Sequence, residues 1–255
     1  MKIGIIGAGN LGGSIAKMLV KNGYKKSIMI SDNKNLEIFN EFQRYSNQEI
    51  IDKSDVLFLC VKPNDVKELL KNFHFNSLDK LLISCVAGIS IKYLEEKLNE
   101  RYPIIRCMAN IPISLGKGSI TFIKNNFVID DLIGEFYNIC NGPTMIQVEK
   151  ENLIDVSTIL TGSMPAFSSF ISKEIIDFGV RNGLKYEDSR DLYISTIIGT
   201  MEMLKTNSPE DIIKAVSSPN GVTKTGLYYL EESRSILFTT LENSLNTISS
   251  LKNKN

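Results

Sequence analysis

Short apolar runs and helical patterns alternate along the first part of the chain. The apolar runs lie at 2–6, 27–31, 55–61, 80–85, 104–108 and 119–123. Helical periodicity lies between most of them, at 14–22, 36–45, 66–71 and 91–98. Continuous apolar runs are typical of strands buried on both faces, and their alternation with helices indicates βαβ units. We therefore predict an α/β domain over residues 1–150, with a doubly wound parallel sheet and helices on both of its faces.

The second half of the chain has a different pattern. Helices are predicted at 153–160, 165–182, 186–206, 209–216, 222–231 and 235–251. Ser163 ahead of Pro165 and Ser208 ahead of Pro209 are typical helix starts, and Gly183 is a typical helix end. No stretch rich in Pro, Gly or Ser separates the two halves. We expect an all-α domain over residues 151–255 that is joined tightly to the first domain.

A glycine motif directly follows the first predicted strand. Residues 7–12 read Gly-Ala-Gly-Asn-Leu-Gly, which is G-x-G-x-x-G. Gly7 permits a tight turn, Gly9 lets a pyrophosphate approach the backbone, and Gly12 lets the helix pack closely on the strand. The N–H groups that open the next helix attract phosphate. A glycine turn without a ligand is the alternative, but the order strand–motif–helix favours a dinucleotide-binding domain of the Rossmann type.

The ends of the predicted strands carry the other candidate cofactor residues, because ligands of such sheets bind beyond the carboxyl ends of the strands. The expected cofactor-binding residues are Gly7, Gly9, Asn10, Leu11, Gly12, Asp32, Asn33, Lys34, Val61, Lys62, Pro63, Ala87, Gly88 and Asn110. At Lys62 a polar strand end is an equally good interpretation.

Asp32 makes the choice between NAD and NADP ambiguous. An acidic residue at the end of the second strand binds the ribose 2′-hydroxyl of NAD and repels the 2′-phosphate of NADP. Asn33 and Lys34 follow directly and can hold that phosphate if Asp32 turns away. Capping of the next helix is a third role for Asp32. These residues alone favour NAD.

Composition and charge exclude several classes of protein. The 29 basic and 29 acidic residues give a formal net charge of zero, so no overall field favours nucleic acid or an acidic membrane. The apolar runs are shorter than a membrane span, and with the fold starting at residue 2 we expect no signal peptide. The four cysteines have no C-x-x-C spacing. We expect reduced cysteines, no metal site and a cytoplasmic protein.

A set of segments in a fixed order carries a family resemblance. The segments are 5–12 (IIGAGNLG), 54–63 (SDVLFLCVKP), 84–91 (SCVAGISI), 105–112 (IRCMANIP), 116–119 (GKGS), 161–167 (TGSMPAF) and 216–223 (VSSPNGVT). Together they resemble the pyrroline-5-carboxylate reductases over nearly the whole chain. The resemblance implies reduction of 1-pyrroline-5-carboxylate to L-proline by NAD(P)H, with NADP favoured. It also implies a helical domain that intertwines with a second subunit in a homodimer or higher homo-oligomer.

The segment 218–223 is the candidate substrate site. It opens a predicted helix, so its N–H groups can bind a substrate carboxylate. The resemblance also places Met164 near the substrate. The expected substrate-binding residues are Met164, Asn220, Gly221, Val222 and Thr223. Thr223 and Ser218 are the expected catalytic residues, because their hydroxyls can hydrogen-bond the ring nitrogen. Simple capping of the helix by Ser or Thr is the alternative.

Four residues depart from the usual family pattern. Met164 and Asn220 replace glycines, although Asn tolerates positive φ and can keep the backbone shape. Phe167 replaces a tyrosine, and Ile111 stands where threonine is frequent. These departures leave two alternatives open. One is a reductase of a different cyclic imine acid, and the other is a catalytically lapsed NAD(P)-binding dimer with a regulatory role.

The sequence offers no strong general acid. The single histidine, His74, lies between two phenylalanines away from the predicted strand ends, which favours a structural role. Lys173 lies in a charged helical stretch and is interpreted as part of a solvated face. An imine that arrives protonated needs no strong acid from the protein, which agrees with this pattern.

Overall fold

The structure is a computed structural model that describes residues 1–34, 36–71, 80–98, 101–219 and 221–252. The chain forms two compact units: Met1–Pro165 with Ser244–Asn255, and Ala166–Asn243. The sequence-based division at residue 150 stays a prediction, because compactness and function need not divide a chain at the same residue. No helix among the described residues has the length and apolar character needed to cross a bilayer.

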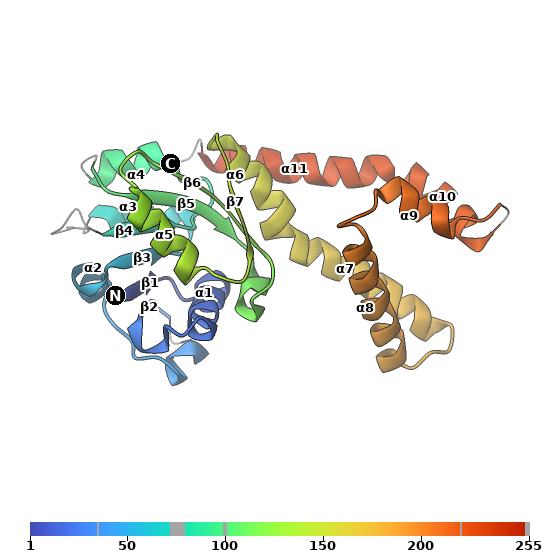
Figure 1. Cartoon of the computed structure of the whole chain (residues 1–255), viewed down its shortest axis with the longest axis horizontal. Coiled ribbons are helices and arrows are strands. Elements are labelled where there is room, and N and C mark those ends of the chain that lie inside the picture. The colour runs from blue at the N-terminus through green and yellow to red at the C-terminus, as the bar shows by residue number, and fades with distance from the viewer. Residues whose placement is uncertain (35, 72–79, 99–100, 220, 253–255) are drawn as a thin grey trace. The chain divides into compact units, whose positions relative to one another are not determined.

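The first unit is built around a seven-stranded sheet (Figure 1). Its strands are β1 (Ile3–Ile6), β2 (Ile28–Ser31), β3 (Val56–Leu59), β4 (Leu81–Ser84), β5 (Ile104–Ala109), β6 (Ser119–Lys124) and β7 (Thr144–Gln147). Its helices are α1 (Asn10–Lys21), α2 (Asn47–Lys53), α3 (Pro63–Lys71), α4 (Ile91–Leu98), α5 (Asp130–Ile139) and α6 (Asn152–Ser157). The predicted α/β sheet is confirmed.

The strand order is β2-β1-β3-β4-β5-β6-β7. The first five strands are parallel, but β6 is antiparallel to β5, so the expectation of a wholly parallel sheet is wrong. A parallel crossover needs about a dozen or more residues. The connection 110–118 holds only a 3₁₀ turn (Ile111–Leu115) and glycines at positive φ, and the chain therefore turns back.

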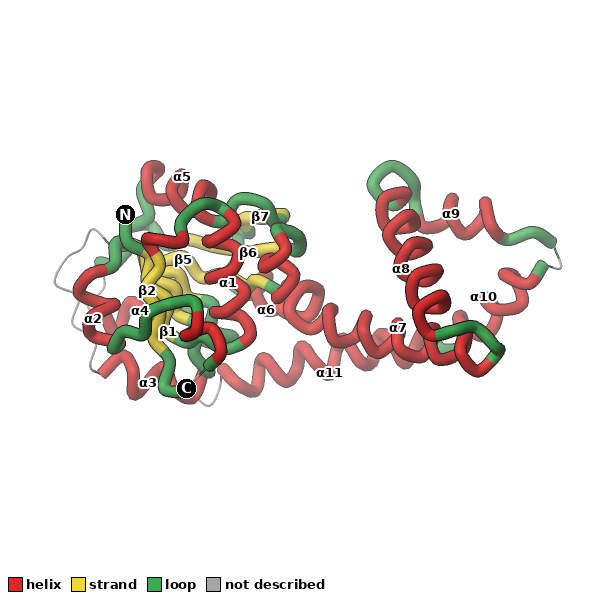
Figure 2. Tube along the Cα trace, turned by 90° about the horizontal axis from the view of Figure 1, so that it is seen from below, coloured by secondary structure: helices red, strands yellow, loops and turns green. Residues whose placement is uncertain are grey.

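Each buried strand sends alternate side chains to opposite faces of the sheet. Figure 2 shows the strands of this sheet in yellow, with helices in red around them. Ile5 and Phe58 pack with α1 and α5 on one face. Leu57 and Leu59 pack with α2, α3 and α4 on the other face. Both faces are apolar, which explains why the strands read as unbroken apolar runs in the sequence.

One local prediction fails in this unit, and three of its elements were not predicted. The helix predicted at 36–45 is wrong, because that stretch holds only a 3₁₀ turn (Glu37–Asn40) and a bridge at Arg44. The helix lies later, at α2, which was not predicted and which Ser46 and Glu49 start with a capping box. The helix α5 and the edge strand β7 were not predicted. β7 is short and mostly exposed, so it lacks the apolar run used to identify strands.

The second unit is entirely helical. The helices of the C-terminal part are α7 (Met164–Arg181), α8 (Tyr186–Met203), α9 (Pro209–Val216), α10 (Val222–Glu232) and α11 (Arg234–Lys252). Ser208 caps α9 by accepting a hydrogen bond from the Asp211 N–H. Gly183 ends α7 at φ +99°, in the left-handed conformation typical of a helix end. Both predicted signals are confirmed.

The predicted helix start at Ser163 is wrong. Residues 152–181 are helical throughout, because a π-helical segment (Thr158–Ser163) joins α6 to α7. Pro165, which has no backbone N–H, lies inside this continuous stretch, just after the π-helical segment.

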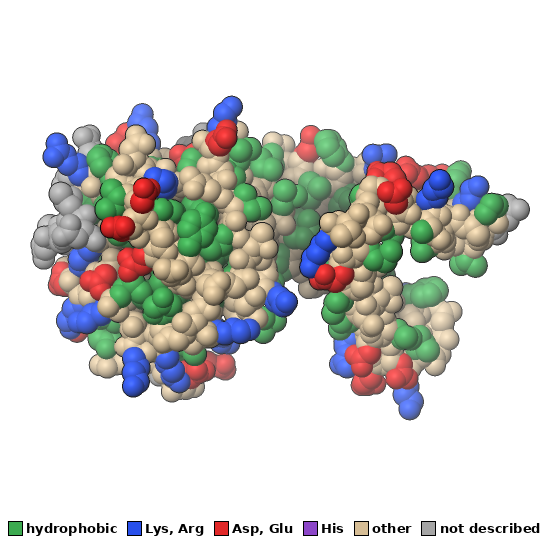
Figure 3. Space-filling model, in the orientation of Figure 1, with side chains coloured by type: hydrophobic (Ala, Val, Ile, Leu, Met, Phe, Trp, Pro, Cys, Tyr) green, Lys and Arg blue, Asp and Glu red, His purple; other side chains and the backbone are tan. Residues whose placement is uncertain are grey.

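The second unit buries few of its apolar side chains. α7 and α8 meet through small residues: a Cβ on Gly179 would lie 2.1 Å from the Ser189 Oγ. Phe170, Phe178 and Ile198 are each more than 60% exposed, as are Tyr228 and Leu230. Figure 3 shows apolar side chains on the surface of these helices. Exposure on this scale is typical of a surface that a protein partner covers.

Candidate functional site

The glycine loop after β1 is shaped by the backbone around it. Gly7 has φ +93°, and a Cβ there would lie 2.6 Å from the Cys60 carbonyl oxygen. A Cβ on Gly12 would lie 1.9 Å from the Gly7 carbonyl oxygen. Neither position can hold a side chain without movement of the backbone. The roles predicted for Gly7 and Gly12, a tight turn and close packing of helix on strand, agree with this geometry.

Gly9 has a different environment from the other two glycines of the motif. A Cβ there would meet no heavy atom within 4 Å, and its φ of −61° needs no glycine. Gly9 and Asn10 are exposed, and no side chain among the described residues caps α1, so the first N–H groups of this helix are available to a ligand. Neither packing nor backbone strain accounts for Gly9. A dinucleotide pyrophosphate fits this space, because it requires both an open backbone and free N–H donors.

The strand order places this loop at the switch point of the sheet. From β1 the chain continues to β2 on one side and then to β3 on the other, and ligands bind at such a point. The loop after β3 lies next to the glycine loop, through the close approach of Cys60 to Gly7. Val61 and Pro63 are half-buried there, while Lys62 is exposed.

The predicted residues after β4 lie at the same end of the sheet, because β4 is parallel to β3. Ala87 and Gly88 form a turn in which Gly88 has φ +76°. The structure therefore brings the predicted residues after β1, β3 and β4 to one edge. Leu11 is half-buried against the core of α1, so its side chain packs inward.

Asp32 is turned back onto the glycine loop. Its Oδ2 accepts a hydrogen bond from the Ala8 N–H at 2.8 Å, and its Oδ1 accepts one from the Lys34 N–H at 2.8 Å. Asn33 and Lys34 have exposed side chains. The suggestion that Asp32 caps the next helix is wrong, because the following 3₁₀ turn has Leu36 at its N-cap and no side-chain cap.

Asn110 supports the backbone at the end of β5. Its Oδ1 accepts a hydrogen bond from the Ser119 N–H at 3.0 Å, and its Nδ2 donates to the Thr161 carbonyl at 3.3 Å. The side chain thus joins the start of β6 to the π-helical segment. A direct contact between Asn110 and a cofactor stays a prediction.

The π-helical segment Thr158–Ser163 is a feature that the sequence reasoning missed. The Thr158 hydroxyl donates to the Ile154 carbonyl and the Thr161 hydroxyl donates to the Ser157 carbonyl, both at 2.8 Å. A hydroxyl bond to the carbonyl four residues earlier slightly destabilises a helix and often bends it. π-helical turns are frequent at functional sites, and this one precedes Met164. The run of Ser and Thr residues was the available signal.

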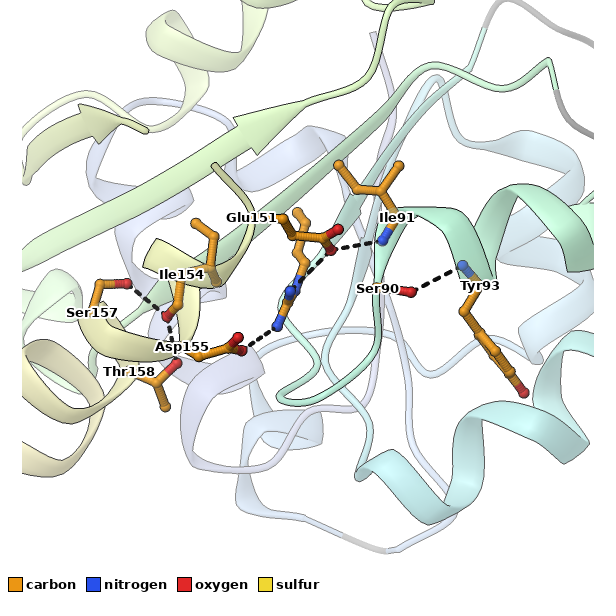
Figure 4. A network of polar contacts seen from close by, with 9 residues as sticks. Ser90, Ile91, Tyr93, Glu151, Ile154, Asp155, Ser157 and Thr158 are labelled. Atoms are coloured by element: carbon orange, nitrogen blue, oxygen red, sulfur yellow. Dashed lines mark hydrogen bonds and ion pairs between the residues drawn. The ribbon is translucent and has the colours of Figure 1, made fainter. Parts of the chain in front are cut away.

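A buried arginine fixes this region to the sheet (Figure 4). Arg106, on β5, is 1% exposed. Its Nη1 lies 2.9 Å from Glu151 Oε1, and its Nη2 lies 2.8 Å from Asp155 Oδ1. Glu151 Oε1 also accepts a hydrogen bond from the Ile91 N–H at the start of α4. Charge-assisted bonds of this kind are strong when buried, so the network holds α6 against β5 and α4.

The candidate substrate segment lies in the second unit. Gly221 is the N-cap of α10 and no side chain of the described residues caps the helix there. The capping role considered for Ser218 and Thr223 therefore finds no support. Val222 is 94% exposed and Thr223 is exposed. Asn220 lies outside the described residues.

Three of the departures from the family pattern lie in the described part of the chain. Met164 and Phe167 are half-buried, and Ile111 is 49% exposed. Lys173 is exposed and its Nζ lies 2.8 Å from Asp177 Oδ2, which confirms the solvated face. His74 lies outside the described residues.

The cysteines are free thiols, and three are buried. The contact with Cys85 and burial together raise the pKa of the Cys107 thiol, and burial raises the pKa of Cys140. Raised pKa values make thiols unreactive, which agrees with core positions. The described residues contain no group of three or more His, Cys, Asp or Glu that can hold a metal ion.

Comparison with known proteins matches both halves of the chain. The family described as "Pyrroline-5-carboxylate reductase dimerisation" matches residues 151–251, and "NADP oxidoreductase coenzyme F420-dependent" matches residues 2–88. The pyrroline-5-carboxylate reductase of Corynebacterium melassecola is 30% identical, over 91% of this chain and 90% of the relative. That of Aquifex aeolicus is 31% identical, over 91% of this chain and 89% of the relative.

Solved structures of pyrroline-5-carboxylate reductases also match this chain over nearly its whole length. A Plasmodium falciparum pyrroline carboxylate reductase with bound NADP has a TM-score of 0.91 and 27% identity, covering 99% of this chain and 98% of that one. The 1-pyrroline-5-carboxylate reductase of Streptococcus pyogenes has a TM-score of 0.86 and 29% identity, covering 99% and 98%. With a glycine loop open at the switch point and relatives that align over nearly the whole chain, this protein belongs to the pyrroline-5-carboxylate reductase family.

Proposed function

We propose that the protein reduces 1-pyrroline-5-carboxylate to L-proline with NAD(P)H. The observation that carries the proposal is the open, uncapped glycine loop in a chain whose relatives over 91% of its length are reductases of this substrate. The reaction adds a hydride to the imine carbon and a proton to the imine nitrogen, and the C=N bond becomes a C–N bond.

The first unit supplies the cofactor seat. The N–H groups that open α1 bind the pyrophosphate at Gly9 and Asn10, and the loops after β3, β4 and β5 lie along the remaining part of the cofactor. When bound, the reduced nicotinamide supplies the hydride. The protein contributes orientation and the exclusion of water, which together account for much of the rate of such reactions.

The second unit supplies the proposed substrate seat. The uncapped N–H groups of α10 bind the substrate carboxylate, with Gly221 and Val222 as backbone donors. Thr223 and Ser218 hold the proton at the ring nitrogen through their hydroxyls. The Ser217 hydroxyl is buried and has no hydrogen-bond partner among the described residues, which supports a role for this segment in binding a ligand.

NADP is the proposed cofactor in preference to NAD. Asp32 turns its carboxylate toward the backbone of Ala8 and Lys34, and the exposed side chains of Asn33 and Lys34 follow it. This is the arrangement in which those two side chains can receive a 2′-phosphate. The Plasmodium falciparum relative has NADP bound.

Self-association through the second unit is part of the proposal. Its exposed apolar side chains lie within the range that matches the dimerisation family. We propose a homodimer in which these helices cover one another. Light scattering after size-exclusion chromatography should give at least twice the chain mass, and a monomeric mass would contradict the proposal.

A different cyclic imine acid is the second candidate substrate. Met164 favours it, because this half-buried side chain directly follows the π-helical segment where the family usually has glycine. Substitution Met164→Gly should then raise proline-forming activity. An unchanged activity would leave the first proposal as the simpler one.

The deciding experiment is oxidation of the reduced cofactor followed at 340 nm with 1-pyrroline-5-carboxylate. NADH and NADPH are used in separate reactions, and proline formation is confirmed by mass spectrometry. Turnover supports the proposed reaction. Absence of turnover with both cofactors, in protein that binds NADPH in calorimetry, would contradict it.

A further inference from the structure

The Thr161 carbonyl lies in a helical stretch but lacks its α-helical donor. Residues 152–181 are helical throughout, and in an α-helix the carbonyl of residue 161 accepts a hydrogen bond from the N–H of residue 165. Residue 165 is a proline, which has no N–H and whose ring clashes with the carbonyl four residues earlier. Pro165 therefore displaces the Thr161 carbonyl from the regular helical pattern.

Asn110, at the end of β5, donates to this carbonyl instead. Its Nδ2 lies 3.3 Å from the Thr161 carbonyl oxygen, and its Oδ1 accepts a hydrogen bond from the Ser119 N–H at 3.0 Å. One partner is an acceptor and the other is a donor, so together they fix which way the amide points. An aspartate, with the same shape, has no donor for Thr161 and can make only the bond to Ser119.

The connection after β5 leaves room for this amide. A Cβ on Gly118 would lie 2.3 Å from the Asn110 Oδ1, and Gly118 has φ +84°. A side chain at position 118 would therefore push the amide away from its two partners. The conformation of the connection and the bond from Asn110 to Thr161 depend on each other.

Asn110 makes the last of three contacts from one face of β5 to the same helical stretch. Arg106 binds Asp155, and a Cβ on Gly162 would lie 3.5 Å from the Met108 Sδ. Arg106, Met108 and Asn110 are every second residue, so they share a face. The first two are buried, whereas Asn110 is half-buried and lies at the carboxyl end of the strand, where ligands of such sheets bind.

We propose that Asn110 is a positioning residue for hydride transfer. It fixes the π-helical segment 158–163, and with it Met164, relative to the carboxyl end of β5. The proposal rests on the proposed function, which puts the cofactor along the loops after β3, β4 and β5 and the imine near Met164. Hydride transfer requires the two reacting atoms at a productive distance and angle, and an error of about 1 Å can lower the rate about 100-fold. Asn110 acts through the Thr161 backbone.

The test removes the donor to Thr161 and keeps the acceptor for Ser119. In Asn110→Asp, at saturating NADPH and 1-pyrroline-5-carboxylate, the single-turnover rate of hydride transfer at 340 nm should fall about 10- to 100-fold. The Kd for NADPH, measured by calorimetry, should stay within about twofold. Asn110→Leu, which is neutral and makes neither bond, should show the same division between rate and affinity. A loss of NADPH affinity as large as the loss of rate in both variants would show direct contact with the cofactor and overturn the proposal.

Asn125→Asp is the matched control. Asn125 makes the same kind of contacts at the other end of β5: its Nδ2 donates to the Tyr102 carbonyl at 2.8 Å, and its Oδ1 accepts from the Ile104 N–H at 3.1 Å. This variant should have a lower Tm but a single-turnover rate within about twofold of the wild type. If its rate fell as far as that of Asn110→Asp, the rate would follow stability, and the proposal would be wrong.

Hydrogen exchange measured by mass spectrometry tests the hold on the segment without any substrate. Loss of one hydrogen bond should speed the exchange of the amides of residues 159–164 about 2- to 10-fold in Asn110→Asp and leave it unchanged in Asn125→Asp. Unchanged exchange in Asn110→Asp would overturn the proposal, whatever the wild type reduces. Faster exchange, in a wild type that does not reduce this imine, would support the hold of Asn110 on the segment and contradict only the proposed reaction.

Discussion

Substitution of single glycines in the loop after β1 separates cofactor binding from folding. Gly9 and Gly12 belong to the same motif, but an added Cβ meets different surroundings at each. At Gly9 it meets no heavy atom within 4 Å, whereas at Gly12 it lies 1.9 Å from the Gly7 carbonyl oxygen. The same chemical change, glycine to alanine, should therefore affect different properties of the protein.

Gly9→Ala should leave the fold intact and weaken cofactor binding. Replacement of glycine by alanine at an unstrained position raises the free energy of unfolding by about 0.4–1 kcal/mol, chiefly because it reduces the conformational entropy of the unfolded chain. For a chain of this size that corresponds to a rise in Tm of about 1–4 °C. The new methyl group occupies the space that a pyrophosphate needs. Loss of one or two hydrogen bonds to a charged group, about 1.5–3 kcal/mol each, raises the Kd for NADPH at least about 10-fold.

Gly12→Ala should destabilise the fold itself. The added atom is about 1.5 Å closer to a backbone oxygen than ordinary contact allows, so α1 must move away from β1. Overpacking of this kind costs about 1–3 kcal/mol and sometimes more. Tm should fall by about 2–10 °C, and cofactor binding should fall with it.

Thermal unfolding without cofactor and calorimetric titration with NADPH measure the two properties. We expect Gly9→Ala to bind NADPH more weakly with no fall in Tm, and Gly12→Ala to have a lower Tm. If Gly9→Ala bound NADPH as tightly as the wild type, the open space at Gly9 would not be the pyrophosphate seat. If Gly12→Ala kept the wild-type Tm, the close approach of α1 to β1 would not constrain the fold.

Two further predictions concern charged residues away from the loop. Arg106→Met should lower the free energy of unfolding, measured in urea titrations, by about 3–5 kcal/mol. The reason is that Glu151 and Asp155 lose the arginine that neutralises them. A loss below about 1 kcal/mol would show that the network contributes little to stability. Hydrogen bonds from the backbone N–H and the hydroxyl of Ser46 hold the pKa of the Glu49 carboxyl below its usual range in the folded protein. The Glu49 carboxylate therefore stabilises the fold fully above its unfolded-state pKa. This stabilisation is lost as the pH falls through the lower pKa of the folded state. The Tm of Glu49→Gln should lie below that of the wild type at neutral pH and converge with it in acid; a constant difference across this range would contradict the assignment.

Features set by short stretches of sequence could be predicted. The turn at Gly7, the cap at Ser208 and the helix end at Gly183 each depend on a few neighbouring residues. The strands β1 to β5 followed from unbroken apolar runs, because α-helices cover both faces of the sheet. Local rules and tertiary structure agree at these places.

Features set by distant contacts could not be predicted. Arg106 meets carboxylates 45 and 49 positions away, and no local pattern marks that pairing. The orientation of Asp32 depends on the Ala8 N–H, 24 positions earlier, so the sequence left its role open. The direction of β6 is a different case: an apolar run predicts a strand without its direction, and the connection 110–118 is shorter than a parallel crossover needs.

The proposed cofactor site and the proposed substrate site differ in how much of each site one chain supplies. The glycine loop is fixed by backbone contacts to Cys60 and by the Asp32 carboxylate, all within the first unit. Among the described residues no side chain caps the start of α10 and none hydrogen-bonds the buried Ser217 hydroxyl, and Val222 is 94% exposed. Covering an exposed apolar side chain is favourable, and Val222 lies in a unit with many other exposed apolar side chains. Cofactor binding is therefore expected to be a property of one chain, whereas we expect self-association to complete the substrate segment.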